Sequence, residues 1–242
     1  MRIGFVCMID KIESNDLGFT AIWSKTTQLE CGTLFMNTNL PDDLFFNKLA
    51  NVTCLSEKMI DETINIFHKN NMHPFVYTLN NSHLEEFLLK KNFKFYDTQY
   101  VLKKHIISES ETSHVHHIEK KDSLLWTKVF CKSYDCYEWI DEVNNIVRNS
   151  FSQVEYLVDA EHNASCVALY EKNSILGLYC LGTLPEKRKK GLAKLLINYA
   201  LNKVKIKNLD FLMLETYRRD DLLGFYSKLG FEKVYEKKIY TI

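Results

Sequence analysis

One segment constrains the fold of this chain more than any other: an apolar strand that runs into a basic turn, a glycine and an amphipathic helix. Residues 175–183 predict a strand that ends before Pro185. Four consecutive cations follow, and a helix is predicted over residues 191–204. The residues of this helix that share one apolar face are Leu192, Leu195, Leu196, Tyr199 and Ala200. A strand that leads directly into a helix favours an α/β fold.

The start of this helix is a candidate anion site. The first N–H groups of a helix have no intrahelical partner, and the helix dipole attracts negative charge there. Gly191 and Ala193 are small enough to let a ligand approach the backbone, and residues 187–190 add positive charge. The segment lacks the G-x-x-x-x-G-K-[ST] and G-x-G-x-x-G patterns of nucleotide-binding loops. A phosphate or pyrophosphate fits here; the alternative is a solvated basic turn before an ordinary surface helix.

Two motifs in this half of the chain carry a resemblance to a known family. Arg188-Lys189-Lys190-Gly191-Leu192-Ala193 resembles the pyrophosphate loop of the GCN5-related N-acetyltransferases (the GNAT family), whose pattern is R/Q-x-x-G-x-G/A. The run from Gly224 to Phe231, with Tyr226, Lys228 and Gly230, is similar to the Y-x-K-x-G-F pattern of the closing helix of that family. The two motifs occur in the family's order, and the resemblance extends over residues 115–242.

The resemblance implies a fold and a co-substrate. The family fold is a mixed, twisted sheet flanked by helices, in which two neighbouring parallel strands diverge and hold acyl-CoA between them. Those strands correspond to residues 175–183 and 210–215. Acetyl-CoA is therefore the expected co-substrate, with its pantetheine arm paired to the backbone of Leu181, Gly182 and Thr183. Its phosphates are expected on the loop formed by Arg188, Lys189, Lys190, Gly191, Leu192 and Ala193.

The resemblance also suggests catalytic residues. Tyr226 falls where many family members keep a tyrosine near the thioester sulfur, and a phenol with a pKa of ~10 can protonate a departing thiolate. The alternative for Tyr226 is simple packing of its ring in the core. The strand over residues 175–183 carries no acid where some members place a general base. Glu215 is therefore the candidate base, with a water chain or no dedicated base as alternatives. Arg218 and Arg219 are candidates for substrate recognition or for plain solvent exposure.

The first half of the chain repeats the predicted order of elements. Residues 87–93 align without a gap on residues 225–231, at an offset of 138 residues. A polar stretch over residues 108–117 separates the halves. We therefore predict an α/β protein with two GNAT-like units, each a mixed twisted sheet flanked by helices, over residues 1–107 and 108–242. The first half has no basic loop, and Leu88 takes the place of Tyr226, so it resembles the degenerate half of a tandem GNAT protein.

Local patterns in the first half predict individual elements. Residues 19–23, 31–36 and 74–79 are expected to be strands. Ser56 is expected to cap a helix, and Ser82 is expected to open a second helix in a capping box with Glu85.

Composition excludes several classes of protein. Hydrophobic residues make up 46% of the 242, charged residues 26%, and the 31 basic side chains equal the 31 acidic ones. This balance favours neither nucleic acid nor an anionic membrane as a partner. Seven cysteines without a C-x-x-C motif predict free thiols and a cytoplasmic protein. No metal site is expected, because a solvated cluster is the more common explanation for His114, His116 and His117.

The resemblance to the GNAT family implies an N-acetyltransferase that transfers an acetyl group from acetyl-CoA to a primary amine by direct attack in a ternary complex. The acceptor is expected to be a small molecule or a peptide, and the protein a monomer or homodimer. Two alternatives stay open at this point. One is an aminoacyltransferase or a longer-chain acyltransferase on the same fold, and the other is a non-catalytic protein that binds CoA or a peptide.

Overall fold

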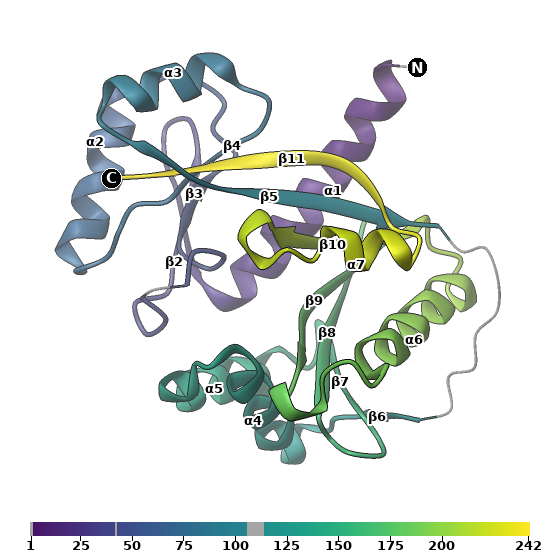
Figure 1. The fold of residues 1–242 in the computed structure, drawn as a ribbon. Coiled ribbons are helices and arrows are strands. Elements are labelled where there is room, and N and C mark those ends of the chain that lie inside the picture. Colours follow the sequence, from purple (N-terminus) through teal and green to yellow (C-terminus); the bar gives the residue numbers. More distant parts are fainter. Residues whose placement is uncertain (1, 42, 106–113) are drawn as a thin grey trace. The chain divides into compact units, whose positions relative to one another are not determined.

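The computed structural model describes residues 2–41, 43–105 and 114–242 (Figure 1). These residues form two compact units whose segments alternate along the chain. The first unit comprises residues 1–19, 103–215 and 229–232, and the second comprises residues 20–102, 216–228 and 233–242. The predicted boundary between residues 107 and 108 lies outside the described residues.

The first unit contains a mixed sheet with the strand order β10-β9-β8-β7-β6. Neighbours from β6 to β9 are antiparallel, and β10 is parallel to β9. Residues 165–169 of β8 are buried without alternation, as expected for a strand covered on both faces. The five strands are β6 (Val115–His117), β7 (Val154–Asp159), β8 (Ser165–Lys172), β9 (Ile175–Thr183) and β10 (Phe211–Tyr217).

Helices cover both faces of this sheet. The helices α4 (Ser123–Tyr134) and α5 (Ile140–Ser150) lie on one face, and α6 (Leu192–Ile206) lies on the other (Figure 1). The predicted helix over residues 191–204 is confirmed, and Leu196 and Ala200 are among its buried residues. Trp126 on α4 is fully buried and donates its indole N–H to the carbonyl of Val167 at 3.0 Å.

The strand predicted over residues 19–23 is wrong, because these residues end the helix α1 (Arg2–Trp23). Within the first unit, Asn15 of α1 donates to the carbonyl of Ile175 at 3.1 Å and accepts the Tyr179 hydroxyl at 2.7 Å. Phe19 stacks on Tyr179 with 3.9 Å between ring centroids. A Cβ at position 177 would lie 2.3 Å from Asn15 Oδ1, so this close approach requires Gly177.

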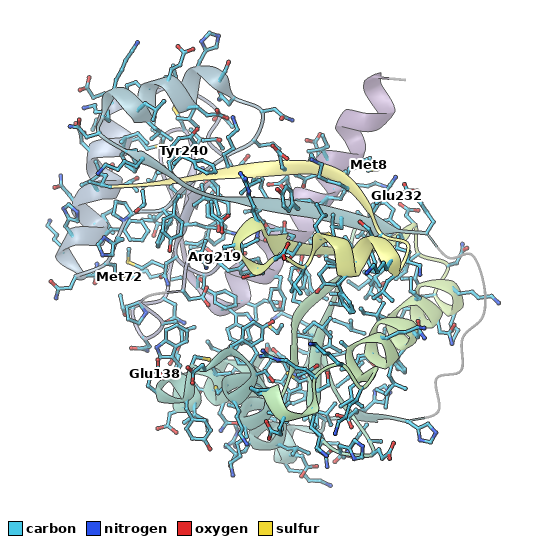
Figure 2. All side chains as sticks on the ribbon, in the orientation of Figure 1. Met8, Met72, Glu138, Arg219, Glu232 and Tyr240 are labelled. Atoms are coloured by element: carbon cyan, nitrogen blue, oxygen red, sulfur yellow. A yellow bond between two sulfur atoms is a disulfide. The ribbon has the colours of Figure 1, made fainter. Side chains whose placement is uncertain are left out.

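The second unit contains strands in the order β1-β2-β3-β4-β11-β5. Figure 2 labels Glu232 at the start of β11 and Tyr240 near its end. The strands are β1 (Lys25–Gln28), β2 (Thr33–Met36), β3 (Lys48–Ala50), β4 (Val76–Thr78), β5 (Lys94–Lys104) and β11 (Glu232–Thr241). The helices are α2 (Glu57–Lys69), α3 (Ser82–Lys90) and α7 (Leu223–Lys228). A core cluster of this unit includes Leu49, Met59, Ile60, Leu84 and Leu88.

The predicted cap of α2 is confirmed, since Ser56 Oγ accepts the N–H of Met59 at 3.2 Å. The predicted capping box of α3 is wrong by one residue. Asn81 is its N-cap and accepts the N–H of Leu84 at 3.0 Å. Asparagine and serine are both good N-caps, so adjacent candidates compete and the sequence alone does not separate them.

The prediction that all seven cysteines are free thiols is wrong for one pair. Cys31 and Cys54 form a disulfide within the second unit, with their Cα atoms 5.3 Å apart. Among the described residues, the cysteines that do not take part in a disulfide are Cys131, Cys136, Cys166 and Cys180. Within the described part of the chain, none of the helices has the length and apolar character needed to cross a membrane.

The same order of elements occurs twice along the chain. The run α2-β4-α3-β5 is followed later by α6-β10-α7-β11. Shifted by the 138 residues of the sequence repeat, β5 would fall on residues 232–242, and β11 covers residues 232–241. The sequence repeat therefore coincides with a repeat of helices and strands.

Candidate functional site

The two parallel strands β9 and β10 are paired over only part of their length. The paired register runs from Ile175 opposite Phe211 to Leu178 opposite Leu214. β9 continues to Thr183 and β10 to Tyr217 beyond this register. We call the stretch beyond these pairs the splay. Backbone groups that β9 directs toward β10 in the splay are not used by the parallel ladder, so they can bind a ligand.

A bulge sets the direction of these backbone groups. The register between β8 and β9 shifts by one residue around Val167. Cys180 there adopts a left-handed conformation with φ 53°, which is uncommon for a residue other than glycine. Such bulges bend a strand and re-aim the groups beside it. No local pattern around Cys180 predicts this departure from regular strand geometry.

The three backbone residues predicted to pair with pantetheine face different ways. The carbonyl of Gly182 accepts Ser165 Oγ at 2.7 Å and therefore faces β8. The carbonyl of Leu181 accepts the Tyr134 hydroxyl at 3.0 Å, and that of Thr183 accepts Arg188 Nε at 3.2 Å. Because successive carbonyls of a strand point to opposite sides, Leu181 and Thr183 direct theirs away from β8. They are the two that a ligand in the splay can reach.

The basic loop leads from β9 into α6. It contains a short 3₁₀ turn (Pro185–Lys187), and Gly191 then adopts φ 85° as the N-cap of α6. Gly191 provides no side-chain cap, and a Cβ built on it would meet no atom within 4 Å. The first turn of α6 contains no acidic residue. The N–H groups at this helix start are therefore open to an anion.

The cations of the loop have distinct roles. Arg188 donates from Nε to the Thr183 carbonyl and from Nη2 to the Ser133 carbonyl at 3.0 Å. It therefore connects the loop to the ends of β9 and α4. Lys189, with φ 62°, and Lys190 are exposed beside Gly191. These two lysines are the better placed to attract a phosphate.

Glu215 lies directly after the last paired residue of β10. The structure brings it together with Glu13 and Asp16 of α1, and carboxylate oxygens of the three lie within 4.8 Å of one another. Asp16 is fully buried. Sequence reasoning missed Glu13 and Asp16, although their i, i+3 spacing places them on one face once residues 2–23 are recognised as a helix.

The residues that could hold a metal ion in the described part of the chain are Glu13, Asp16 and Glu215. His117, considered above as a metal ligand, has other partners. Its Nδ1 lies 3.1 Å from Glu155 Oε1, and its Nε2 lies 2.9 Å from the Tyr199 hydroxyl. Burial as the larger cause, together with the negative charge of Glu155, raises the pKa of Tyr199 to about 12.

Tyr226 lies on α7 and is only 6% exposed. Burial, and secondarily the charge of Asp220, raise the pKa of its phenol above the ordinary value near 10. Because its pKa is raised, the phenol is protonated at neutral pH and able to donate. Tyr226 belongs to the second unit, whereas the loop and Glu215 belong to the first.

Arg219 follows β10 in the second unit and is labelled in Figure 2. Its guanidinium contacts the Tyr96 hydroxyl at 3.0 Å and Asp97 Oδ2 at 3.5 Å. These contacts account for Arg219 within its own unit, so a role in substrate recognition stays a prediction.

The sequence around this site matches a protein-family model. Residues 152–233 match the model described as the acetyltransferase (GNAT) domain. Residues 152–233 form a GNAT domain. This GNAT domain contains the splay, the basic loop, Glu215 and Tyr226.

Solved structures extend the likeness of fold beyond the GNAT domain. A GCN5-related N-acetyltransferase from Kribbella flavida is 11% identical with a TM-score of 0.66, and the match covers 95% of this chain and 93% of the other. A functionally unknown conserved protein from Staphylococcus epidermidis is 13% identical with a TM-score of 0.62, over 90% and 93%. A GCN5-related N-acetyltransferase from Sphaerobacter thermophilus is 8% identical with a TM-score of 0.60, over 76% and 66%.

These matches show that most of the chain has a GNAT-like fold, which confirms the predicted fold class. A comparison with curated proteins gave no match to this sequence.

Proposed function

We propose that this protein is an N-acyltransferase that transfers an acetyl group from acetyl-CoA to a primary amine. The observation that carries the proposal is the juxtaposition of the splay with the start of α6. Leu181 and Thr183 direct carbonyls into the splay, and Gly191 leaves the helix N-terminus uncapped. The first can pair with the amides of pantetheine, and the second can bind the pyrophosphate.

The proposed reaction is a direct transfer. The amine nitrogen attacks the acetyl carbonyl, a C–N bond forms, and the C–S bond breaks as CoA leaves. The departing thiolate takes a proton from Tyr226, and the nitrogen loses one proton to Glu215 or to water. The products are an amide and CoA with a free thiol. Tyr226 regains its proton from solvent, so the cycle balances.

The other half of the chain supports a tandem arrangement with one active half. Leu88 takes the place of Tyr226 and is fully buried. Its hydrocarbon side chain has no acidic proton to donate. The start of α2 is capped by Ser56. The first half therefore has neither the acid nor the open helix start. The acceptor is a small-molecule or peptide amine, and the protein acts in the cytoplasm as a monomer or homodimer.

One observation favours a second candidate, a non-catalytic protein that binds CoA. The burial of Tyr226 and its raised pKa make proton transfer from the phenol to a thiolate more unfavourable. If proximity does not offset this, CoA binds without turnover.

A thiol-release assay tests the proposal. The protein is incubated with acetyl-CoA and a panel of small and peptide amines, and the free thiol is measured over time. Calorimetry with CoA is run in parallel. Amine-dependent thiol release supports the transferase. CoA binding without release on any amine favours the non-catalytic candidate, and the absence of both contradicts the proposal.

A further inference from the structure

The last turn of α4 lies directly against the part of β9 that borders the splay. A Cβ at position 182 would lie 2.7 Å from Ser133 Cβ and 3.2 Å from Tyr134 Cε2, so only glycine fits there. The helix ends at this point because Asp135 adopts a left-handed conformation with φ 54°. Tyr134 is thus held at a fixed helix end beside β9.

Tyr134 uses this position to bind the backbone of β9. Its hydroxyl donates to the Leu181 carbonyl at 3.0 Å, and its ring packs on Phe130 with 4.8 Å between centroids. The Tyr134 residue is nevertheless 50% exposed. The Leu181 carbonyl is one of the two that face away from β8. The Tyr134 hydroxyl already donates a hydrogen bond to it.

We propose that Tyr134 is a positioning residue of the acyl-CoA site that competes with the pantetheine arm for the Leu181 carbonyl. This inference rests on the proposed function. Pantetheine contains two secondary amides, and their N–H groups are hydrogen-bond donors. A carbonyl oxygen has two lone pairs, and in this proposal the amide N–H takes the one that now accepts the Tyr134 hydroxyl, so the two donors exclude each other. Binding of the arm therefore displaces the Tyr134 hydroxyl, while the ring keeps its contact with Phe130.

The competition sets the affinity for ligands that contain pantetheine. The displaced hydroxyl loses a neutral hydrogen bond, which is worth about 1 kcal/mol net, or roughly fivefold in a dissociation constant. Removing the hydroxyl removes this cost from the binding reaction. Tyr134→Phe should therefore bind CoA about three- to tenfold more tightly than the wild type. A structural or direct-contact role for the hydroxyl predicts the opposite sign.

The experiment measures two dissociation constants by calorimetry for each variant. The ligands are CoA and adenosine 3′,5′-bisphosphate, which carries phosphates but no pantetheine. Tyr134→Phe and Tyr134→Leu should both tighten CoA and leave the bisphosphate unchanged. Tyr137→Phe is the matched control, since Tyr137 is similarly exposed three residues further on, and it should change neither constant.

The outcomes separate the inference from the proposed function. Unchanged or weaker CoA binding by Tyr134→Phe, or an equal shift for both ligands, would overturn the role of Tyr134 while leaving CoA binding intact. A wild-type protein that binds neither ligand would overturn the proposed function and this inference with it. Tighter binding of CoA alone supports the competition.

Discussion

Two helices that occupy corresponding places in the two halves of the chain begin in different ways. At α2, Ser56 Oγ satisfies the N–H of Met59, and Glu57 adds a negative charge to the first turn. At α6, Gly191 offers no side chain, and cations precede it. The first helix start has a side-chain cap and a negative charge of its own, whereas the second has neither and is open to an anion. A shared order of elements therefore does not carry a shared ligand site.

The two short helices α3 and α7 show the same kind of difference. Leu88 on α3 is fully buried, and Tyr226 at the corresponding place on α7 is 6% exposed. Both side chains fill a core position, and they differ in the phenol hydroxyl. Core packing thus explains why an apolar or aromatic residue stands at each place, and we propose proton donation as the role of the Tyr226 hydroxyl.

The largest expected effect comes from removing this hydroxyl. Tyr226→Phe keeps the ring and should lower kcat by about 10²–10³, with the KM for acetyl-CoA nearly unchanged, because the interaction is made mainly in the transition state. Since the pKa of Tyr226 is raised above 10, the phenol stays protonated below pH 10 and should cause no loss of rate there. Steady-state kinetics with an accepted amine measures both. A rate within about twofold of the wild type would leave Tyr226 with a packing role only.

The matched change in the other half should affect stability instead of chemistry. Leu88→Ala creates a cavity in a fully buried site and should lower the free energy of unfolding by ~2–4 kcal/mol. The variant should keep its kcat under conditions where it is folded. Urea denaturation and kinetics measure the two quantities. If kcat of the folded Leu88→Ala protein fell as far as that of Tyr226→Phe, the claim that only Tyr226 takes part in the chemistry would be contradicted.

The next effect tests the open helix start. Gly191→Asp places a carboxylate where a phosphate is expected and should weaken CoA binding by about 10- to 100-fold. Gly191→Asn is the matched control, because asparagine is similar in size, is uncharged and tolerates the left-handed conformation of residue 191. It should bind CoA far better than the aspartate variant. If calorimetry gave both variants the same affinity for CoA, the negative charge of the aspartate would not be the cause of the weaker binding.

A smaller effect is expected at the closed helix start. Ser56→Ala removes the cap of α2 and should lower the free energy of unfolding by about 1 kcal/mol. CoA binding should not change, because the phosphates are expected at α6 and not at this helix start. Thermal unfolding and calorimetry on the same sample provide the two readings. A clear loss of CoA affinity in this variant would contradict the assignment of the phosphate site to α6 alone.

The smallest effect is expected from a single exposed cation. Lys190→Glu should weaken CoA binding a few-fold at low salt, and the loss should shrink at high salt because exposed charges are screened. Lys58→Glu, at an exposed position in the first turn of α2, is the control and should have no effect. A loss for Lys190→Glu that did not depend on salt would indicate a direct, desolvated contact.

Much of the GNAT domain was predictable from the sequence because its signals are local. The strand predicted over residues 175–183 coincides with β9, and Gly191 does start the following helix. Outside this domain, the predicted cap of α2 by Ser56 also follows from local chemistry. Each of these predictions depends on neighbours within about one turn of chain.

The features that were missed depend on contacts between distant residues. A strand is predicted over residues 19–23 of α1 because Asn15, Asp16 and Thr20, which are fully buried polar residues, interrupt the apolar period that identifies a helix. The sequence likewise gives no local signal for the disulfide between Cys31 and Cys54. It gives none for the approach of Glu13 and Asp16 to Glu215. No spacing rule relates residues that the tertiary fold alone brings together.

The most direct test of which helix start binds the phosphates is amide hydrogen exchange with and without CoA. The central claim is that the start of α6, and not that of α2, holds them. CoA should slow exchange in peptides that cover residues 188–195 and leave peptides over residues 53–60 unchanged. The first N–H groups of α6, after Gly191, would gain an acceptor, whereas the Met59 N–H at the start of α2 already has Ser56 Oγ. Protection at the start of α2, or CoA binding without protection at the start of α6, would contradict the claim.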